Sequence, residues 1–228
     1  MIRLILWFSL ITFMVSCKPN TNKEDNAIKT TPKILKKITI AASIAQANGL
    51  DHWQKVNTIN FTFNVDRGDN HFERSWSWSP KTNDVSLMTA KDTIHYNHKT
   101  VDSLSISADQ SFINDKFWLL VPFQLVWDHG TTISEPIKAI APISKTEMNK
   151  ISLVYGNEGG YTPGDAYDLY YGKDFIIKEW VFRKGNSETP TMSTTFEKYE
   201  AFDGIQIAKS HRTADGNFEL YFSNISIE

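Results

Sequence analysis

Histidines are the first candidates for chemistry in this sequence, because its 228 residues include six of them but only one cysteine. His95 and His98 lie close together in the chain, yet on a strand their spacing points the two side chains to opposite faces. No His-Glu-x-x-His pattern is present, and a single cysteine cannot supply a multi-thiolate zinc site. The sequence therefore predicts no zinc centre.

Residues 157–168 are the most unusual run in the chain, with three glycines among the carboxylates of Glu158, Asp165 and Asp168. Carboxylate oxygens are Ca²⁺ ligands, but the spacing does not fit an EF-hand loop. We interpret the run as a conformationally constrained loop at the rim of a cavity. The sequence predicts no metal and no cofactor.

Hydrolytic chemistry is a minor alternative, since no Gly-x-Ser-x-Gly nucleophile motif is present and His129 lies in a turn-like Asp-His-Gly run. A hydrolase would require the fold to bring together two or three of His95, His98, His129, Asp165 and Asp168. We predict no catalytic residues and expect the protein not to be an enzyme.

Cys17 is the residue with the clearest chemical role, because it stands where a hydrophobic leader ends. Arg3 precedes an apolar run over residues 4–15, which is too short for a transmembrane helix but suits a signal peptide. Residues 14–17, Met-Val-Ser-Cys, resemble a bacterial lipobox, in which the thiol is alkylated with diacylglycerol. Acyl chains on Cys17 would anchor the protein to a membrane. The alternative is an ordinary secretory leader with an accidental cysteine.

These features predict three segments along the chain. Residues 1–16 form a lipoprotein signal peptide, residues 17–31 the lipidated cysteine with a polar, flexible tether, and residues 32–228 a single domain. Lys18 gives no inner-membrane retention signal by resemblance to the enterobacterial sorting rule, so we expect an outer-membrane location in the cell envelope. Asp92-Thr93 and Asp102-Ser103 resemble the O-glycosylation acceptors of Bacteroidota.

Composition excludes several other classes of protein. A formal net charge of −2 and a pI near 6.3 argue against nucleic-acid binding, which usually needs a strongly basic face. Hydrophobic residues make up 41% of the chain and charged residues 22%, which excludes global disorder. We expect one globular domain that is a monomer.

The elements that must position these side chains follow from periodicity. Apolar residues recur at helical spacing over about residues 32–48. Alternation then predicts an antiparallel meander, and the apolar stretch 112–127 breaks it with one or two short helices interrupted at Pro122. Strands resume around residues 132–141 and 150–156 and in further segments, including residues 190–200. We predict an α+β fold with about eleven strands in one large, bent antiparallel sheet.

This layout resembles the periplasmic lipoprotein-carrier superfamily (LolA/LolB-like), and more closely Bacteroidota lipoproteins of uncharacterised function. The similarity covers most of residues 32–228, with local echoes at residues 49–53, 118–123 and 157–167. It implies a bent half-barrel whose concave side is apolar and covered by helices.

The resemblance also implies a greasy ligand, either a lipid or the acyl chains of a lipoprotein. The candidate ligand-binding residues are Phe61, Phe63, Phe72, Arg74, Trp76, Trp78, Trp118 and Phe123. Carriers of this superfamily use an Arg on an early strand for closure, and Arg74 occupies a comparable place; otherwise it is a surface or salt-bridged residue. The leading hypothesis is a non-enzymatic outer-membrane lipoprotein that binds a hydrophobic ligand. The alternative is a structural lipoprotein with a packed sheet and an exposed apolar patch that docks an envelope partner.

Overall fold

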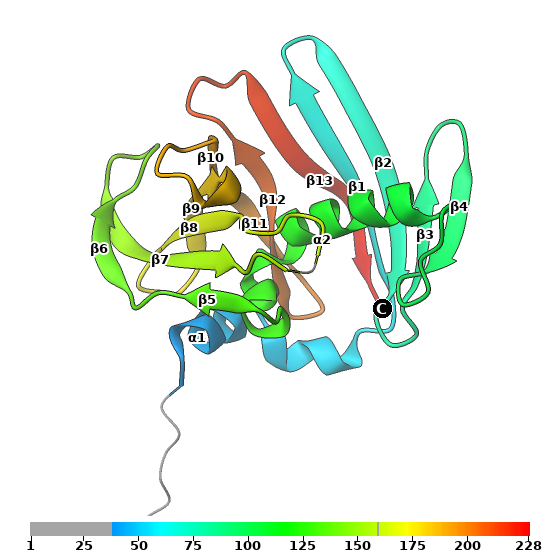
Figure 1. Ribbon diagram of the computed structural model, residues 1–228, viewed down its shortest axis with the longest axis horizontal. Coiled ribbons are helices and arrows are strands. Elements are labelled where there is room, and N and C mark those ends of the chain that lie inside the picture. The colour runs from blue at the N-terminus through cyan, green and yellow to red at the C-terminus, as the bar shows by residue number, and fades with distance from the viewer. Residues whose placement is uncertain (1–37, 159) are drawn as a thin grey trace, which may run out of the picture. The chain divides into compact units, whose positions relative to one another are not determined.

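Two antiparallel sheets make up most of the computed structural model, which describes residues 38–158 and 160–228 (Figure 1). These residues belong to one compact unit, Lys37–Glu228. The predicted signal peptide, Cys17 and the tether lie outside the described residues and stay predictions.

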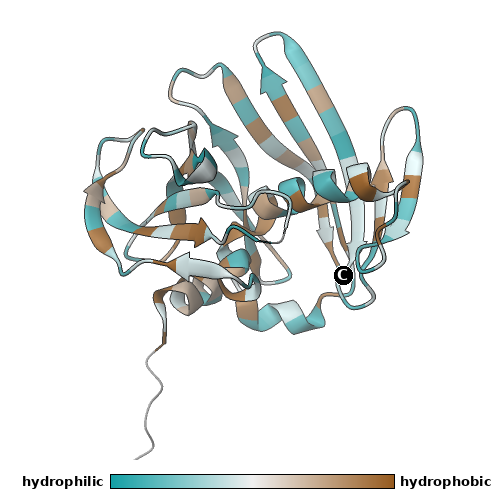
Figure 2. Ribbon diagram, in the orientation of Figure 1, coloured by the Kyte–Doolittle hydropathy of each residue, from teal (hydrophilic) through white to brown (hydrophobic). Residues whose placement is uncertain are grey.

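The first sheet has seven strands and the second has six. In spatial order, the first contains β11 (Glu197–Phe202), β12 (Ile205–Arg212), β13 (Phe218–Ile227), β1 (Ile59–Arg67), β2 (Asn70–Ser79), β3 (Asp84–Met88) and β4 (Thr93–Asn97). The second contains β10 (Met192–Thr195), β9 (Ile177–Arg183), β8 (Ala166–Tyr171), β7 (Glu147–Tyr155) and β5 (Thr131–Ile133), with β6 (Ile137–Ile140) also paired to β7. Alternating apolar and polar bands along β1, β2 and β13 are visible in Figure 2.

The predicted fold class is confirmed: the structure is mostly antiparallel sheet with few helices, and neither sheet closes on itself. It has thirteen strands in the described residues, divided between two sheets, instead of about eleven strands in one sheet. Two predicted strands are each divided in two. Pro136, which cannot donate to a ladder, separates β5 from β6.

Phe196 divides the other strand, because the chain passes there from the second sheet to the first. The imidazole of buried His211 lies 3.1 Å from the Thr195 carbonyl oxygen, and the Arg212 amide donates to Thr195 Oγ1. The segment from β10 to β11 therefore connects the two sheets.

Among the described residues, the N-terminal helix occupies the second half of its predicted range. α1 spans Ile40–Ala47, and the Thr39 hydroxyl accepts a hydrogen bond from the Ala42 amide as an N-cap. Residues 32–37, where we placed its start, lie outside the described residues. Gly49 ends it with a φ of 94°, and a Cβ there would overlap the Gly204 carbonyl oxygen.

The remaining helices are α2 (Ile106–Trp127) and two short 3₁₀ turns, η1 (Leu50–Lys55) and η2 (Lys184–Asn186). α2 begins earlier than predicted and continues through Pro122, with a kink at Leu120 (φ −126°, ψ 24°). Pro122 causes the kink, because its ring has no N–H for the Trp118 carbonyl and displaces that carbonyl.

The C-terminal part of α2, residues 119–125, is buried on both faces, which explains why residues 117–123 show no alternation. Phe112, Leu120 and Phe123 pack into the core on the first sheet, while Val121 and Leu125 pack into the core on the second. Figure 1 shows α2 running across both sheets. Among the described helices, none is long and apolar enough to cross a membrane.

Candidate functional site

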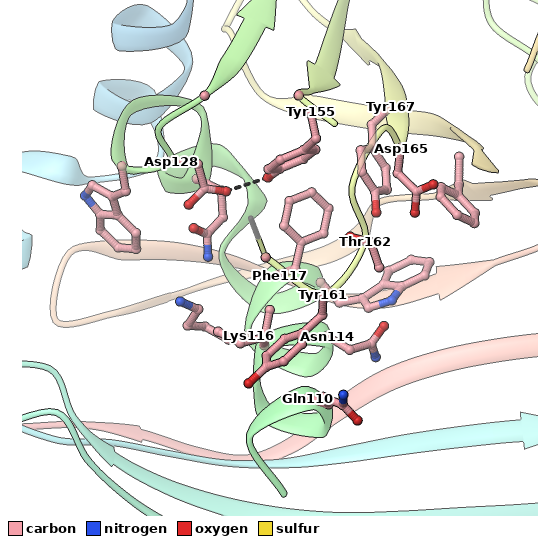
Figure 3. A pocket seen from close by; sticks show the side chains of 18 of the residues that line it. Gln110, Asn114, Lys116, Phe117, Asp128, Tyr155, Tyr161, Thr162, Asp165 and Tyr167 are labelled. Carbon is pink, nitrogen blue, oxygen red and sulfur yellow. Dashed lines mark hydrogen bonds between the residues drawn. The ribbon is translucent and has the colours of Figure 1, made fainter. Parts of the chain in front are cut away.

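A cavity of about 630 Å³ lies between α2, the second sheet and the loop that joins β7 to β8 (Figure 3). The sheet contributes Tyr155, Tyr167, Trp180, Phe182 and Met192. α2 and the turn after it contribute Gln110, Ile113, Asn114, Lys116, Phe117, Trp118, Gln124, Trp127, Asp128, His129 and Gly130. The loop adds Gly156, Glu158, Gly160, Tyr161, Thr162 and Asp165. The volume of the cavity is in the range of small-molecule sites.

An aromatic platform forms the floor of this cavity. Tyr167 and Phe182 are directly opposite each other on β8 and β9, and their rings stack with centroids 5.2 Å apart. Phe117 reaches down from α2, with its centroid 4.7 Å from that of Tyr167 and 5.8 Å from that of Trp180. The result is an apolar surface that suits an acyl chain or another hydrophobic group.

Polar groups gather on one side of Phe117, where Figure 3 shows Asp128 and Lys116. The Tyr155 hydroxyl donates to Asp128 Oδ2 at 2.5 Å. Burial raises the pKa of Asp128, an effect that the Tyr155 bond and the Lys116 charge oppose. Burial lowers the pKa of Lys116, whose ammonium lies 5.5 Å from the centre of the Trp78 ring. This end of the cavity can donate and accept hydrogen bonds in a low-dielectric setting.

Two side-chain hydrogen bonds hold the β7–β8 loop in place. The Tyr161 hydroxyl donates to Asp109 Oδ2 at 2.6 Å near the start of α2, and this bond raises the pKa of Tyr161 to about 12. Asp165 Oδ1 accepts from the Gly185 amide at 2.8 Å. The predicted position of this loop at the rim of a cavity agrees with the structure.

Of the eight residues predicted to bind a ligand, only Trp118 lines this cavity. Phe72 is 49% exposed. Five others are buried between the first sheet and α2: Phe61, Phe63, Trp76, Trp78 and Phe123. Their contact with a ligand stays a prediction, and in this structure they pack against one another, against α2, and against Trp53 and Phe222.

Arg74 is the eighth, and it is a salt-bridged residue. Its Nε and Nη2 donate to the two carboxylate oxygens of Asp115 on α2, each at 2.6 Å. The Trp76 indole N–H donates to the same carboxylate at 2.7 Å. These bonds join β2 to α2.

Three of the five residues that a hydrolase would need bond to partners that do not line the cavity. The His95 ring lies 2.7 Å from the Ser86 hydroxyl, and the His98 ring lies 2.5 Å from Asp109. Asp168 accepts from Arg183, whereas Asp165 and exposed His129 both line the cavity. Within residues 38–158 and 160–228, no three His, Cys, Asp or Glu side chains form a group that could hold a metal ion. Thr93 and Ser103, the predicted glycosylation positions, are both exposed.

Sequence reasoning missed most of the cavity. Tyr155, Tyr167 and Phe182 alternate along their strands in the same way as the core residues of the first sheet, so periodicity does not distinguish them. Lys116 was the available signal, because it is a lysine placed directly before the apolar run 117–123. A charge there must face either solvent or a cavity.

Comparison with known proteins gives only distant structural similarity. A LolA superfamily protein from Nitrosomonas europaea is 12% identical, with a TM-score of 0.48, covering 82% of this chain and 93% of that one. A DUF1329 family protein from Desulfovibrio piger is 9% identical, with a TM-score of 0.44, covering 83% and 93% respectively. No protein-family model and no curated protein matches the sequence. At these identities and TM-scores, neither similarity bears on what the cavity binds.

Proposed function

We propose that this chain is an exported, lipid-anchored envelope protein that binds a hydrophobic ligand in the cavity between α2 and the second sheet. The observation that carries the proposal is the cavity itself, about 630 Å³ in volume and floored by Tyr155, Tyr167, Trp180 and Phe182. A space of this size with an aromatic floor accommodates an acyl chain. The anchor rests on Cys17 and its leader.

The cavity favours ligand binding over a purely structural role. A structural lipoprotein would have a packed sheet and an exposed apolar patch. Ile137 and Ile140 on β6 are 54% and 59% exposed, but two isoleucines on one short strand form only a small apolar area.

Native mass spectrometry of residues 18–228, purified gently from the native host, tests the proposal. This fragment contains the whole compact unit, and circular dichroism checks that it is folded. We expect a co-purifying lipid mass that mild organic solvent releases. A ligand-free mass, together with no uptake of added fatty acids or lipopeptides, would refute the proposal.

A cavity-filling variant gives the matched control. Ile113 lines the cavity, so Ile113→Trp should block uptake by occupying the space. Ile106, also on α2, is 44% exposed and does not line the cavity, so Ile106→Trp should bind as the wild type does. Equal lipid uptake by both variants would place the ligand elsewhere.

A further inference from the structure

Several hydrogen-bond donors in the cavity have no partner within the described residues, among them the Trp180 indole N–H and the side chains of Gln124 and Lys116. Gln124 is only 3% exposed, and its side-chain amide lines the cavity without a hydrogen bond from any described residue. The Lys116 ammonium likewise forms no hydrogen bond or ion pair in the described part of the chain, and it lies over the rings of Trp78 and Phe112. Leaving donors unpaired in a partly desolvated site is unfavourable, so both groups favour a ligand that carries an acceptor.

The neighbouring carboxylates do not supply that acceptor. Asp109 already accepts from Tyr161 and lies against His98, while Asp115 is held by Arg74. Asp128 accepts from Tyr155 through one oxygen. Lys116 therefore feels the charges of Asp128 and Asp109 but forms no direct ion pair with either in the described structure, and its ammonium faces the cavity.

We propose that Lys116 and Gln124 bind the carboxylate of a fatty-acid-like amphiphile whose chain lies on the aromatic platform. The inference rests on the proposed function and specifies the chemical class of its ligand. A carboxylate has two acceptor oxygens, which match one ammonium and one amide N–H donor. A neutral alcohol or ester would give Lys116 no charge-assisted hydrogen bond to an anion.

The local charge favours a monoanion over a phosphate. Lys116 is the one lysine that lines the cavity, and Arg side chains are absent from the described lining. Asp128, Glu158 and Asp165 line the same cavity, and their charges oppose any anion and a doubly charged one most strongly. A phosphate monoester near neutral pH would bring that second charge.

The test compares three ligands with one chain length: dodecanoate, dodecanol and dodecyl phosphate. Their affinities for residues 18–228 are measured by calorimetry or by displacement of a fluorescent fatty acid. We expect the wild type to bind dodecanoate about tenfold or more tightly than dodecanol, because a charge-assisted hydrogen bond is lost with the alcohol. Dodecyl phosphate should bind more weakly than dodecanoate.

Lys116→Met keeps the apolar stem and removes the charge, so it should abolish the preference for dodecanoate while dodecanol still binds. Lys91→Met, at an exposed loop position, is the matched control and should retain the preference. Gln124→Met is a second variant, for use if Lys116→Met does not fold. It should weaken dodecanoate binding and leave dodecanol binding unchanged.

The outcomes separate the two proposals. If neither dodecanoate nor dodecanol binds the wild type, the proposed function itself fails. If both bind with equal affinity, the cavity binds greasy ligands and the carboxylate inference is overturned. Tighter binding of dodecyl phosphate than of dodecanoate would also overturn it, as would a preference that persists in both Lys116→Met and Gln124→Met.

Discussion

Arg74 of β2 and Asp115 of α2 form a two-bond ion pair, in which the guanidinium Nε and Nη2 donate to the two carboxylate oxygens at 2.6 Å. The Asp115 side chain is 0% exposed and that of Arg74 is 17% exposed. Together with the Trp76 hydrogen bond to the same carboxylate, this pair links the first sheet to the helix that borders the cavity. The role of Arg74 can therefore be tested by measuring how much a substitution lowers the free energy of unfolding.

We expect Arg74→Met to destabilise the protein by about 3–5 kcal/mol, because it leaves the Asp115 carboxylate buried without its cation. Urea unfolding of residues 18–228 measures the change. Arg212 forms a surface pair with Glu197 at 2.7 Å, with 48% of its side chain exposed, so Arg212→Met is the matched control and should cost under about 1 kcal/mol. Equal losses in the two variants would show that Asp115 finds other compensation.

The sequence predicts features of the fold that depend on a local pattern of residues, but not those that depend on contacts between distant parts of the chain. Alternation at Phe61, Phe63, Trp76 and Trp78 correctly indicated strands with one buried face, and the antiparallel α+β class followed from it. Phe196 could not be recognised as the crossing between sheets, because a strand that changes sheets keeps the same alternation on both sides.

The cavity could not be predicted for a related reason. Trp76 and Trp180 are both buried aromatic residues on alternating strands, but only Trp180 lines empty space. Whether an aromatic face is filled depends on side chains from α2, far away in the sequence. A consequence is that Trp76→Asp would disrupt the core and is not a clean test of ligand binding.

Gly49 should not tolerate a side chain, because its φ is 94° and a Cβ would overlap the Gly204 carbonyl oxygen. We expect Gly49→Ala to cost about 3 kcal/mol, measured by thermal or urea unfolding. Gly68 also has a positive φ, of 56°, but nothing lies within 4 Å of its would-be Cβ. Gly68→Ala should therefore cost only about 1 kcal/mol. Similar losses at both positions would mean that backbone strain, not the contact with Gly204, dominates.

Tyr155→Phe should raise the pKa of Asp128 further above its ordinary value. The Tyr155 hydroxyl donates to the Asp128 carboxylate, and this bond favours the charged form. Carboxyl ¹³C chemical shifts followed by NMR against pH measure the change. Tyr167→Phe is the matched control, because Tyr167 lines the same cavity without a hydrogen bond to Asp128 in the described structure. An unchanged Asp128 titration in Tyr155→Phe would show that the bond is absent in solution.

His211 should make stability depend on pH in mildly acidic solution. Its ring is fully buried at the junction of the two sheets, with centroids 4.4 Å from Phe196 and 5.3 Å from Trp118. Burial lowers its pKa from 6.5 to about 3, so the neutral ring donates from Nδ1 to the Thr195 carbonyl oxygen. His211 therefore stays neutral in the fold over a range in which the unfolded chain is protonated.

The sign follows from proton counting. Between pH 3 and 6.5 the unfolded state carries one more proton at His211 than the folded state, so stability falls as pH is lowered through this window. The contribution of His211 approaches ~1.4 kcal/mol for each pH unit below its unfolded pKa. His211→Phe should reduce the slope of unfolding free energy against pH by this amount, and His95→Phe, exposed on β4, controls for the loss of one histidine. An equal slope in wild type and His211→Phe would mean that the ring is hydrated or mobile in solution. The junction between the sheets would then be looser than the packing of Phe196 and Trp118 indicates.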